Sequence, residues 1–114
     1  MRAIASKLKR KLRKGDTTER CGLVLSDGKA VECNNSHPEP SNGFVIPARA
    51  LLKHEGRIKG TWHTHPHGDS LLSQEDYAGF SQWPDLTHFI IGLDGVRAYR
   101  VEDGIIREVD LAAG

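Results

Sequence analysis

The sequence predicts an α+β domain, a mixed α/β sandwich in which a central and largely antiparallel sheet is flanked by about three helices. The prediction depends on the order of the elements, which reads helix, strands, helix, strand, helix, strands. A chain of 114 residues leaves no room for a second hydrophobic core. Its 38% hydrophobic and 27% charged residues are typical of a globular protein, and no stretch approaches the ~20 apolar residues of a membrane helix. We therefore expect residues 1–114 to form a single domain.

The first predicted element is a basic amphipathic helix within residues 1–15. Apolar side chains recur every four residues, at Ile4, Leu8 and Leu12, and lysine or arginine fills most of the other positions. The first twenty residues contain eight Lys/Arg and two acids, whereas the rest contain eight Lys/Arg and thirteen acids. Like charges four residues apart weaken such a helix, so we expect it to pack on the sheet through its apolar stripe. The alternative is a docking arm for an acidic partner.

Two groups of short strands follow, one before and one after the middle of the chain. Ser26-Asp27-Gly28 predicts a tight turn between strands at 21–25 and 29–33. Two more Asp-Gly pairs separate three later strands, which predict an antiparallel meander at 87–93, 96–101 and 105–109. The side chains expected to be buried in this meander are Phe89, Ile91, Leu93, Val96 and Val101.

Two helices and one strand are predicted between these groups. Pro47 begins a helix that ends at Gly56. Residues 58–61 then begin a strand. The next helix covers residues 74–80, because Ser73 is a suitable N-cap for it.

The strand and the second of these helices carry a candidate metal site. Because successive side chains of a strand alternate between faces, His63 and His65 point to the same side, with their α-carbons about 6.6 Å apart. Pro66 stops the strand directly after this pair. A catalytic Zn²⁺ needs a third protein ligand, and Asp76, in the first turn of the following helix, is a good candidate. Capping of that helix by Ser73 and Asp76 is the purely structural alternative.

The same residues give the sequence a family resemblance. His63-Thr64-His65-Pro66, six residues, Ser73, two residues and Asp76 match the H-[ST]-H-P-x(6)-S-x(2)-D motif of the JAB/MPN metalloproteases, also called JAMM. Upstream, Glu19-Arg20-Cys21-Gly22 resembles the E-x-C-G stretch of prokaryotic members. The similarity extends from about Glu19 to Val101.

The resemblance implies a zinc-dependent peptidase or isopeptidase. It implies that His63, His65 and Asp76 bind Zn²⁺, that Glu19 accepts a proton from the activated water, and that Ser73 stabilises the oxyanion. The substrate would be a protein or peptide, such as a ubiquitin-like or phage tail-related protein. Members that process ubiquitin grip it with two inserted segments, for which this chain has little room.

Two rival functions have specific sequence requirements. A non-catalytic MPN-type interaction module typically lacks one or more metal ligands, and none is missing here. A nucleotide deaminase, whose fold resembles the predicted one, requires His-x-Glu and a later Pro-Cys-x-x-Cys, which the sequence does not contain. Low aromatic content argues against a nucleic-acid partner.

The remaining histidines and cysteines are given structural interpretations. Cys21 and Cys33 cannot form a disulfide framework, and no signal peptide is recognisable, so we expect a reducing, cytoplasmic location with no membrane contact. Cys21 is expected to be a buried small apolar residue. His67 is expected in a loop near the mouth of the site, whereas His37, His54 and His88 have no partner at ligand spacing.

Overall fold

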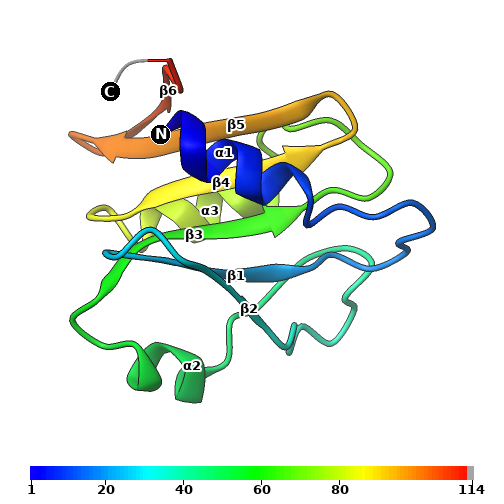
Figure 1. The fold of residues 1–114 in the computed structure, drawn as a ribbon, viewed down its shortest axis with the longest axis horizontal. Helices are drawn as coiled ribbons and strands as arrows, with labels where there is room; N and C mark the ends of the chain where they lie inside the picture. The colour runs from blue at the N-terminus through cyan, green and yellow to red at the C-terminus, as the bar shows by residue number, and fades with distance from the viewer. Residues whose placement is uncertain (113–114) are drawn as a thin grey trace.

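The computed structural model describes residues 1–112 and contains one six-stranded sheet with three helices (Figure 1). The helices are α1 (Arg2–Lys9), α2 (Ala48–Lys53) and α3 (Gln74–Ser81). The strands are β1 (Cys21–Leu25), β2 (Ala30–Cys33), β3 (Ile58–Thr64), β4 (Thr87–Gly92), β5 (Gly95–Glu102) and β6 (Ile105–Val109). Their order in the sheet is β2-β1-β3-β4-β5-β6, and β3 and β4 form the one parallel pair among them. The predicted fold class is confirmed.

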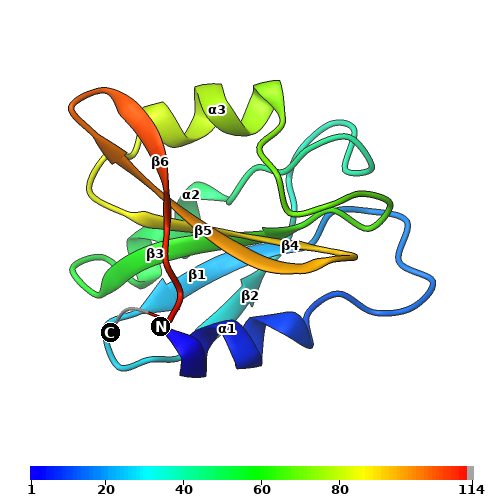
Figure 2. The same ribbon diagram turned by 90° about the horizontal axis from the view of Figure 1, so that it is seen from above.

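The sheet separates two hydrophobic clusters. Helix α1 covers one face and α3 covers the other, as Figure 2 shows from above. On the α1 face, Leu8 and Trp62 belong to a buried cluster that also contains Val24, Phe89, Ile91 and Ala98. On the α3 face, the cluster consists of Phe80, Ile90 and Tyr99. Alternation along β3 therefore sends Trp62 to the α1 side and His63 to the α3 side.

Gly22 of the E-x-C-G stretch has a packing role on the α1 face. A β-carbon at this position would collide with the Val31 carbonyl and the indole ring of Trp62. The ring is held there by its Nε1 proton, which it donates to the Val31 carbonyl oxygen at 3.2 Å. Gly22 thus lets β1 and β2 close over Trp62 at the base of the segment that carries Glu19.

Two sequence predictions about local structure need correction. The first helix ends at Lys9, short of the expected end near Gly15, and the chain continues in turns. Leu8 anchors the helical part, whereas like-charged pairs continue past Lys9 with only Leu12 to pack against the core. Leu93, expected to be buried, is 70% exposed because β4 ends at Gly92 and Leu93 belongs to the turn. Within residues 1–112, no helix is both long and apolar enough to cross a membrane.

His88 is a buried structural residue, and it makes folding sensitive to pH. Its Nδ1 lies 2.8 Å from Thr61 Oγ1, its Nε2 lies 3.0 Å from the Trp83 carbonyl oxygen, and its ring stacks on Phe80. Burial lowers the pKa of His88 from 6.5 to about 4. Between these values the unfolded chain binds a proton that the folded protein does not, so the free energy of unfolding falls as the pH is lowered.

We expect His88→Gln to remove part of this acid sensitivity. The loss attributable to His88 is at most ~1.4 kcal/mol for each pH unit between 6.5 and about 4. Urea unfolding of metal-free protein at several pH values measures it as the difference between wild type and variant. His67→Gln, at an exposed position, is the control. Identical slopes in wild type and His88→Gln would contradict the assignment.

Candidate metal centre

The register of three neighbouring strands brings the candidate site residues together. Strand β3 lies between β1 and β4, and Cys21 in β1 pairs with His63 in antiparallel register. Two residues before Cys21, Glu19 therefore lies beside the end of β3, near His65. A hydrogen bond of 2.9 Å from the Thr64 amide to the Arg20 carbonyl oxygen extends the pairing to this point. The site thus forms where β3 ends, on the face covered by α3.

Three side chains meet with almost equal distances between their polar atoms. Asp76 Oδ1 lies 2.9 Å from His63 Nε2, and Asp76 Oδ2 lies 3.0 Å from His65 Nε2. The two Nε2 atoms are 3.1 Å apart. Ligands of a tetrahedral Zn²⁺ at ~2.0–2.1 Å are separated by about 3.3 Å, so the two Nε2 atoms have nearly the spacing that one ion requires, and each Asp76 oxygen lies at a similar distance from one of them. The donor set of two imidazoles and one carboxylate also suits Zn²⁺.

The surrounding hydrogen bonds fix these side chains in orientations suited to a metal. His65 Nδ1 lies 2.7 Å from the Asp69 carbonyl oxygen, so Nδ1 carries a proton, and Nε2, which contacts Asp76, is the nitrogen that could bind a metal ion. Asp76 is held by a capping box, in which its amide donates to Ser73 Oγ at 3.1 Å and its carboxylate accepts from the Ser73 amide at 3.2 Å. The ring of His63 stacks on Phe44, with centroids 4.2 Å apart. The capping box is therefore present, and it is compatible with the candidate ligand role of Asp76.

Electrostatics favour an ionised Asp76 beside an uncharged His63. Burial alone would raise the pKa of the Asp76 carboxyl group, but hydrogen bonds from the two histidines hold it well below its usual range. Complete burial lowers the pKa of the His63 imidazole, although Asp76 opposes this effect. Burial also disfavours charge on His65, but its hydrogen bonds to Asp76 and to the Asp69 carbonyl oxygen raise its pKa overall. A neutral imidazole and an ionised carboxylate are the protonation states in which these groups bind metals.

Glu19 is the buried acid of the site. Its Oε1 atom is buried and has no hydrogen-bond partner among residues 1–112. Glu19, His63 and His65 each offer one atom within 4.8 Å of the others, so these three side chains form a group that could hold a metal ion. Burial raises the pKa of Glu19 to about 7, where a carboxyl group exchanges protons readily at neutral pH. A carboxylate at this distance is suited either to bind an ion or to contact a ligand bound on it.

Asn35 holds the backbone near Glu19 through hydrogen bonds that the sequence does not predict, and we call this set of contacts the clamp. The Asn35 Nδ2 group donates to the carbonyl oxygens of Glu19 and Gly43, both at 2.9 Å. Its Oδ1 accepts from the amides of His37 and Val45, both at 3.0 Å. The two donors and the acceptor oxygen of the Asn35 side-chain amide are therefore all in use. These contacts close the loop around the backbone of Glu19.

The same loop is also attached to α3 and to the Glu19 amide. His37 Nε2 lies 2.8 Å from Glu75 Oε1, next to Asp76 in the sequence. The Glu19 amide donates to the Pro40 carbonyl oxygen at 2.7 Å. An asparagine within a Pro/Asn/Ser loop is typical of any turn, so the spacing in the sequence gives no sign that Asn35 reaches back across sixteen residues.

We expect Asn35→Asp to loosen this clamp without unfolding the sheet. The substitution keeps both acceptor contacts but removes the N–H donors to Glu19 and Gly43, which leaves two carbonyl oxygens facing a carboxylate. Amide hydrogen exchange of Glu19 should become on the order of 10-fold faster, while amides of β3 stay protected. Asn42→Asp is the matched control, because Asn42 lies in the same loop but its side chain bonds only the exposed Glu39 carboxylate. Unchanged protection of the Glu19 amide in Asn35→Asp would show that the clamp is not needed.

The other residues singled out in the sequence lie outside the cluster. Cys21 is fully buried, and burial raises the pKa of its thiol to about 12, which fits a packing role. Cys33 is a free, half-buried thiol. His67 is exposed and lines a different hollow, together with the end of the α1 segment. Ser73 lies at the start of α3 as predicted, directly beside Asp76.

Solved structures of other proteins share this architecture. Protein DSY2949 from Desulfitobacterium hafniense is similar with a TM-score of 0.71 and 22% sequence identity, over 92% of this chain and 84% of that one. AF2198, a JAB1/MPN domain protein from Archaeoglobus fulgidus, is similar with a TM-score of 0.60 and 20% identity, over 96% of this chain and 93% of that one. At these identities the likeness concerns the fold alone. No curated protein matches the sequence.

The fold and the site together define a domain of the JAB/MPN type. A mixed sheet presents two histidines at the end of β3, and a helix adds an aspartate that completes a possible metal site. The family described as prokaryotic homologs of the JAB domain matches residues 1–102. The chain belongs to this family, which confirms the resemblance found in the sequence.

Proposed function

We propose that the protein is a zinc-dependent peptidase or isopeptidase, in which His63, His65 and Asp76 hold the ion. The observation that supports this function best is the convergence of His63, His65 and Asp76, whose polar atoms lie 2.9–3.1 Å apart in pairs, with the buried and unpartnered Oε1 atom of Glu19 in the same site. When bound, Zn²⁺ would lower the pKa of a coordinated water to about 7 and polarise the carbonyl group of an amide. The four side chains fit this cofactor in type and in spacing.

The chain's own residues supply the proton transfers. Glu19 accepts a proton on its buried carboxylate and passes it to the leaving amine, because its pKa of about 7 suits both steps. Ser73 Oγ accepts the Asp76 amide proton, so its own hydroxyl proton remains available to the carbonyl oxygen of the substrate. Donors of this kind stabilise the tetrahedral oxyanion by about 2.7–4 kcal/mol. The capped start of α3 therefore holds the candidate Asp76 ligand and a candidate oxyanion donor in one rigid unit.

A pocket beside the candidate metal centre supports a peptide as the substrate. It has a volume of about 410 Å³ and lies between α3 and the segment that leads into α2. Asp76 and Glu75 line its polar side, and Phe44, which stacks on His63, lines it next to the candidate ligands. Its apolar lining includes Ile46, Leu51, Phe80, Trp83 and Leu86. A pocket of this composition accommodates an apolar part of a polypeptide next to the bond that is cleaved.

We expect Gly79→Leu to block this pocket while leaving the fold and the metal site intact. Gly79 lies in α3 on the pocket wall, and a β-carbon there would meet no atom within 4 Å. The leucine side chain would therefore project into the pocket, and kcat/KM should fall about 10-fold or more, with unchanged zinc content.

Gly79→Ala is the control for this substitution. It places only one methyl group on the pocket wall, and it stabilises the helix interior by roughly 0.5–1 kcal/mol. If Gly79→Leu keeps the kcat/KM of Gly79→Ala, the pocket does not bind the substrate.

The proposed function is tested by an activity screen on fusions of small ubiquitin-like proteins to a reporter. We expect cleavage at the junction, loss of cleavage with a chelator, and recovery on addition of Zn²⁺. Metal analysis of the same protein separates hydrolysis from the alternative of a non-catalytic interaction module. About one zinc per chain with chelator-sensitive cleavage supports the enzyme, and a folded protein that never binds zinc supports the module. A cytoplasmic location remains a prediction.

A further inference from the structure

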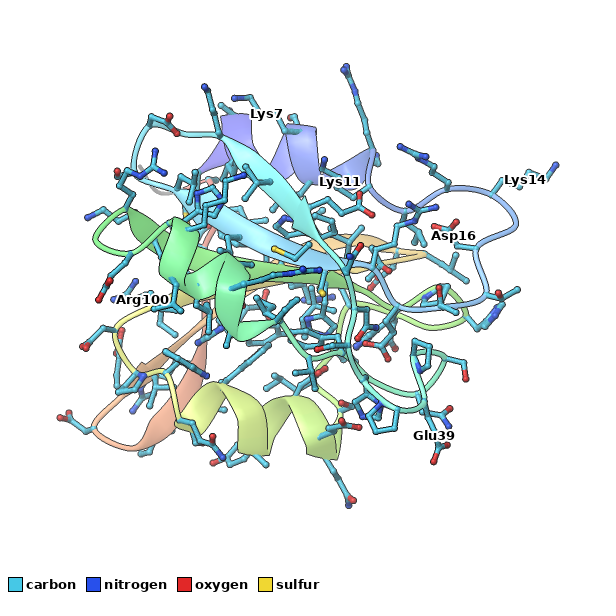
Figure 3. All side chains as sticks on the ribbon, turned by 90° about the horizontal axis from the view of Figure 1, so that it is seen from below. Lys7, Lys11, Lys14, Asp16, Glu39 and Arg100 are labelled. Carbon is cyan, nitrogen blue, oxygen red and sulfur yellow. The ribbon has the colours of Figure 1, made fainter. Side chains whose placement is uncertain are left out.

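The N-terminal segment carries a positive charge that the rest of the protein leaves unneutralised. Seven lysine and arginine residues lie between positions 2 and 14, and none of them forms an ion pair with a carboxylate in the described part of the chain. Asp16, the nearest acid in sequence, is held by Arg20 through two contacts of 3.0 Å. Figure 3 shows Lys7, Lys11 and Lys14 spread along the α1 side of the molecule, away from Glu39.

Only two of these basic side chains have a role within the fold. Lys7 Nζ donates to the Gly28 carbonyl oxygen at 3.1 Å, and Lys11 Nζ lies 5.4 Å from the centroid of the Trp62 ring. The side chains of the other five make no hydrogen bond within residues 1–112; they are Arg2, Lys9, Arg10, Arg13 and Lys14. Like charges this close together repel one another, and these five side chains gain no partner among the described residues in return, so packing of the fold does not account for them.

A hollow beside these charges adds an apolar component to the surface. It has a volume of about 590 Å³ and lies between the end of the α1 segment and the β4–β5 turn. Lys9, Arg13 and Lys14 line one part of it, and Leu12, Pro66 and Leu93 line the other. Leu93 is 70% exposed, so this hollow presents an uncovered apolar side chain next to three cations.

The two acids of the hollow are already bound within the protein. Asp16 is paired with Arg20, whose hydrogen bond lowers the pKa of the Asp16 carboxyl group. Asp94 accepts a hydrogen bond from the Ser70 amide at 2.9 Å and lies 3.9 Å from Arg97. Three cations, Lys9, Arg13 and Lys14, thus face two acids that have partners elsewhere, so the lining of the hollow carries a net positive charge.

We propose that the hollow and the adjoining basic residues form a docking surface for an acidic polypeptide segment that carries large apolar side chains. The three cations match carboxylates, and Leu12, Pro66 and Leu93 match the apolar side chains. A bilayer fits less well, because Ile4, Leu8 and Leu12 pack on the core and leave α1 no apolar face to insert. Nucleic acid also fits less well, because no phenylalanine, tyrosine or tryptophan in residues 1–112 lines the hollow. This surface is independent of the proposed hydrolysis and needs no bound metal.

The test is a fluorescence anisotropy titration of the full chain with a labelled peptide of repeated Glu-Glu-Leu units. We expect Arg13→Glu/Lys14→Glu to weaken binding at least 10-fold, and Leu93→Ser, which changes no charge, to weaken it about 3- to 10-fold. Arg49→Glu/Lys53→Glu makes the same change of charge on the exposed side of α2 and should weaken binding less than 3-fold. A peptide with serine in place of leucine should bind wild type at least as weakly as the parent peptide binds Leu93→Ser, because it also loses the contacts with Leu12 and Pro66.

Each other outcome would overturn the proposal. Equal losses in the two double variants would mean that only net charge matters. Equal binding of the leucine and serine peptides would show that apolar contacts do not contribute to binding. Tighter binding of a DNA duplex than of the peptide would assign the surface to nucleic acid. Self-association that Arg13→Glu/Lys14→Glu abolishes, with no peptide binding, would assign it to a second copy of the chain.

Discussion

Glu19→Gln should lower kcat by 10²–10⁴-fold while zinc stays bound, which is the range that a general base contributes. Glutamine has nearly the same shape as glutamate, and the backbone of Glu19 is held by Asn35 and Pro40, so the fold should be preserved. The amide of glutamine cannot accept the proton that the proposed mechanism assigns to the Glu19 carboxylate, whose Oε1 atom is buried without a partner among residues 1–112. Initial rates on the substrate identified in the fusion screen, together with zinc analysis of the same samples, measure both properties.

Glu39→Gln is the matched control for this substitution. It makes the same change of charge in the loop that closes over Glu19, but at an exposed position. Its rate should equal that of wild type. An unaltered kcat in Glu19→Gln would remove Glu19 from the mechanism, and loss of zinc would instead make it a metal ligand.

His65→Ala should abolish both zinc binding and hydrolysis. The substitution removes one member of the cluster formed with His63 and Asp76, and two remaining ligands do not form a sufficient site for Zn²⁺. His65 is partly exposed, so the folded protein should tolerate its loss better than that of the fully buried His63. Zinc content after dialysis, with thermal unfolding of the metal-free proteins as a check of folding, measures the effect.

His67→Ala provides the control for a lost imidazole. His67 lies only two residues further along, but it is exposed and lines the hollow beside the N-terminal segment rather than the candidate metal centre. It should keep the zinc content and activity of wild type. Full zinc content in His65→Ala would contradict the proposed ligand set.

Local patterns in the sequence were enough to predict most elements of the fold. The Asp-Gly turns lie where expected, since each needs only a few neighbouring residues, and Gly28 has the positive φ of 86° that such a turn favours. The parallel pairing of β3 with β4 depends on how α3 crosses over the sheet, so no local pattern predicts it. The sequence predicts a buried Leu93, because the alternation of apolar residues continues one position past the end of β4 into the turn. Hydrophobic character alone does not show where the strand ends.

The candidate site divides in the same way into local and long-range parts. His63 and His65 are placed together by strand alternation, and Ser73 and Asp76 by the geometry of a helix start. Glu19 reaches the two histidines because of the register between β1 and β3. The family resemblance implies a role for Glu19 in the site, but spacing in the sequence does not predict that register. Contacts of Asn35 and Phe44 with this cluster join segments that are far apart in the sequence, and neither residue type is distinctive enough to indicate them.

The most direct test of the proposed metal centre is zinc X-ray absorption of the purified wild-type protein. Two imidazole nitrogens from His63 and His65, one carboxylate oxygen from Asp76 and one further light ligand should give a first shell of four N/O atoms at about 2.0–2.2 Å. His65→Ala should lose this spectrum together with its zinc. A shell containing sulfur at about 2.3 Å would place the ion on Cys21 or Cys33 instead. That result, or a folded wild-type protein that binds no zinc, would contradict the account.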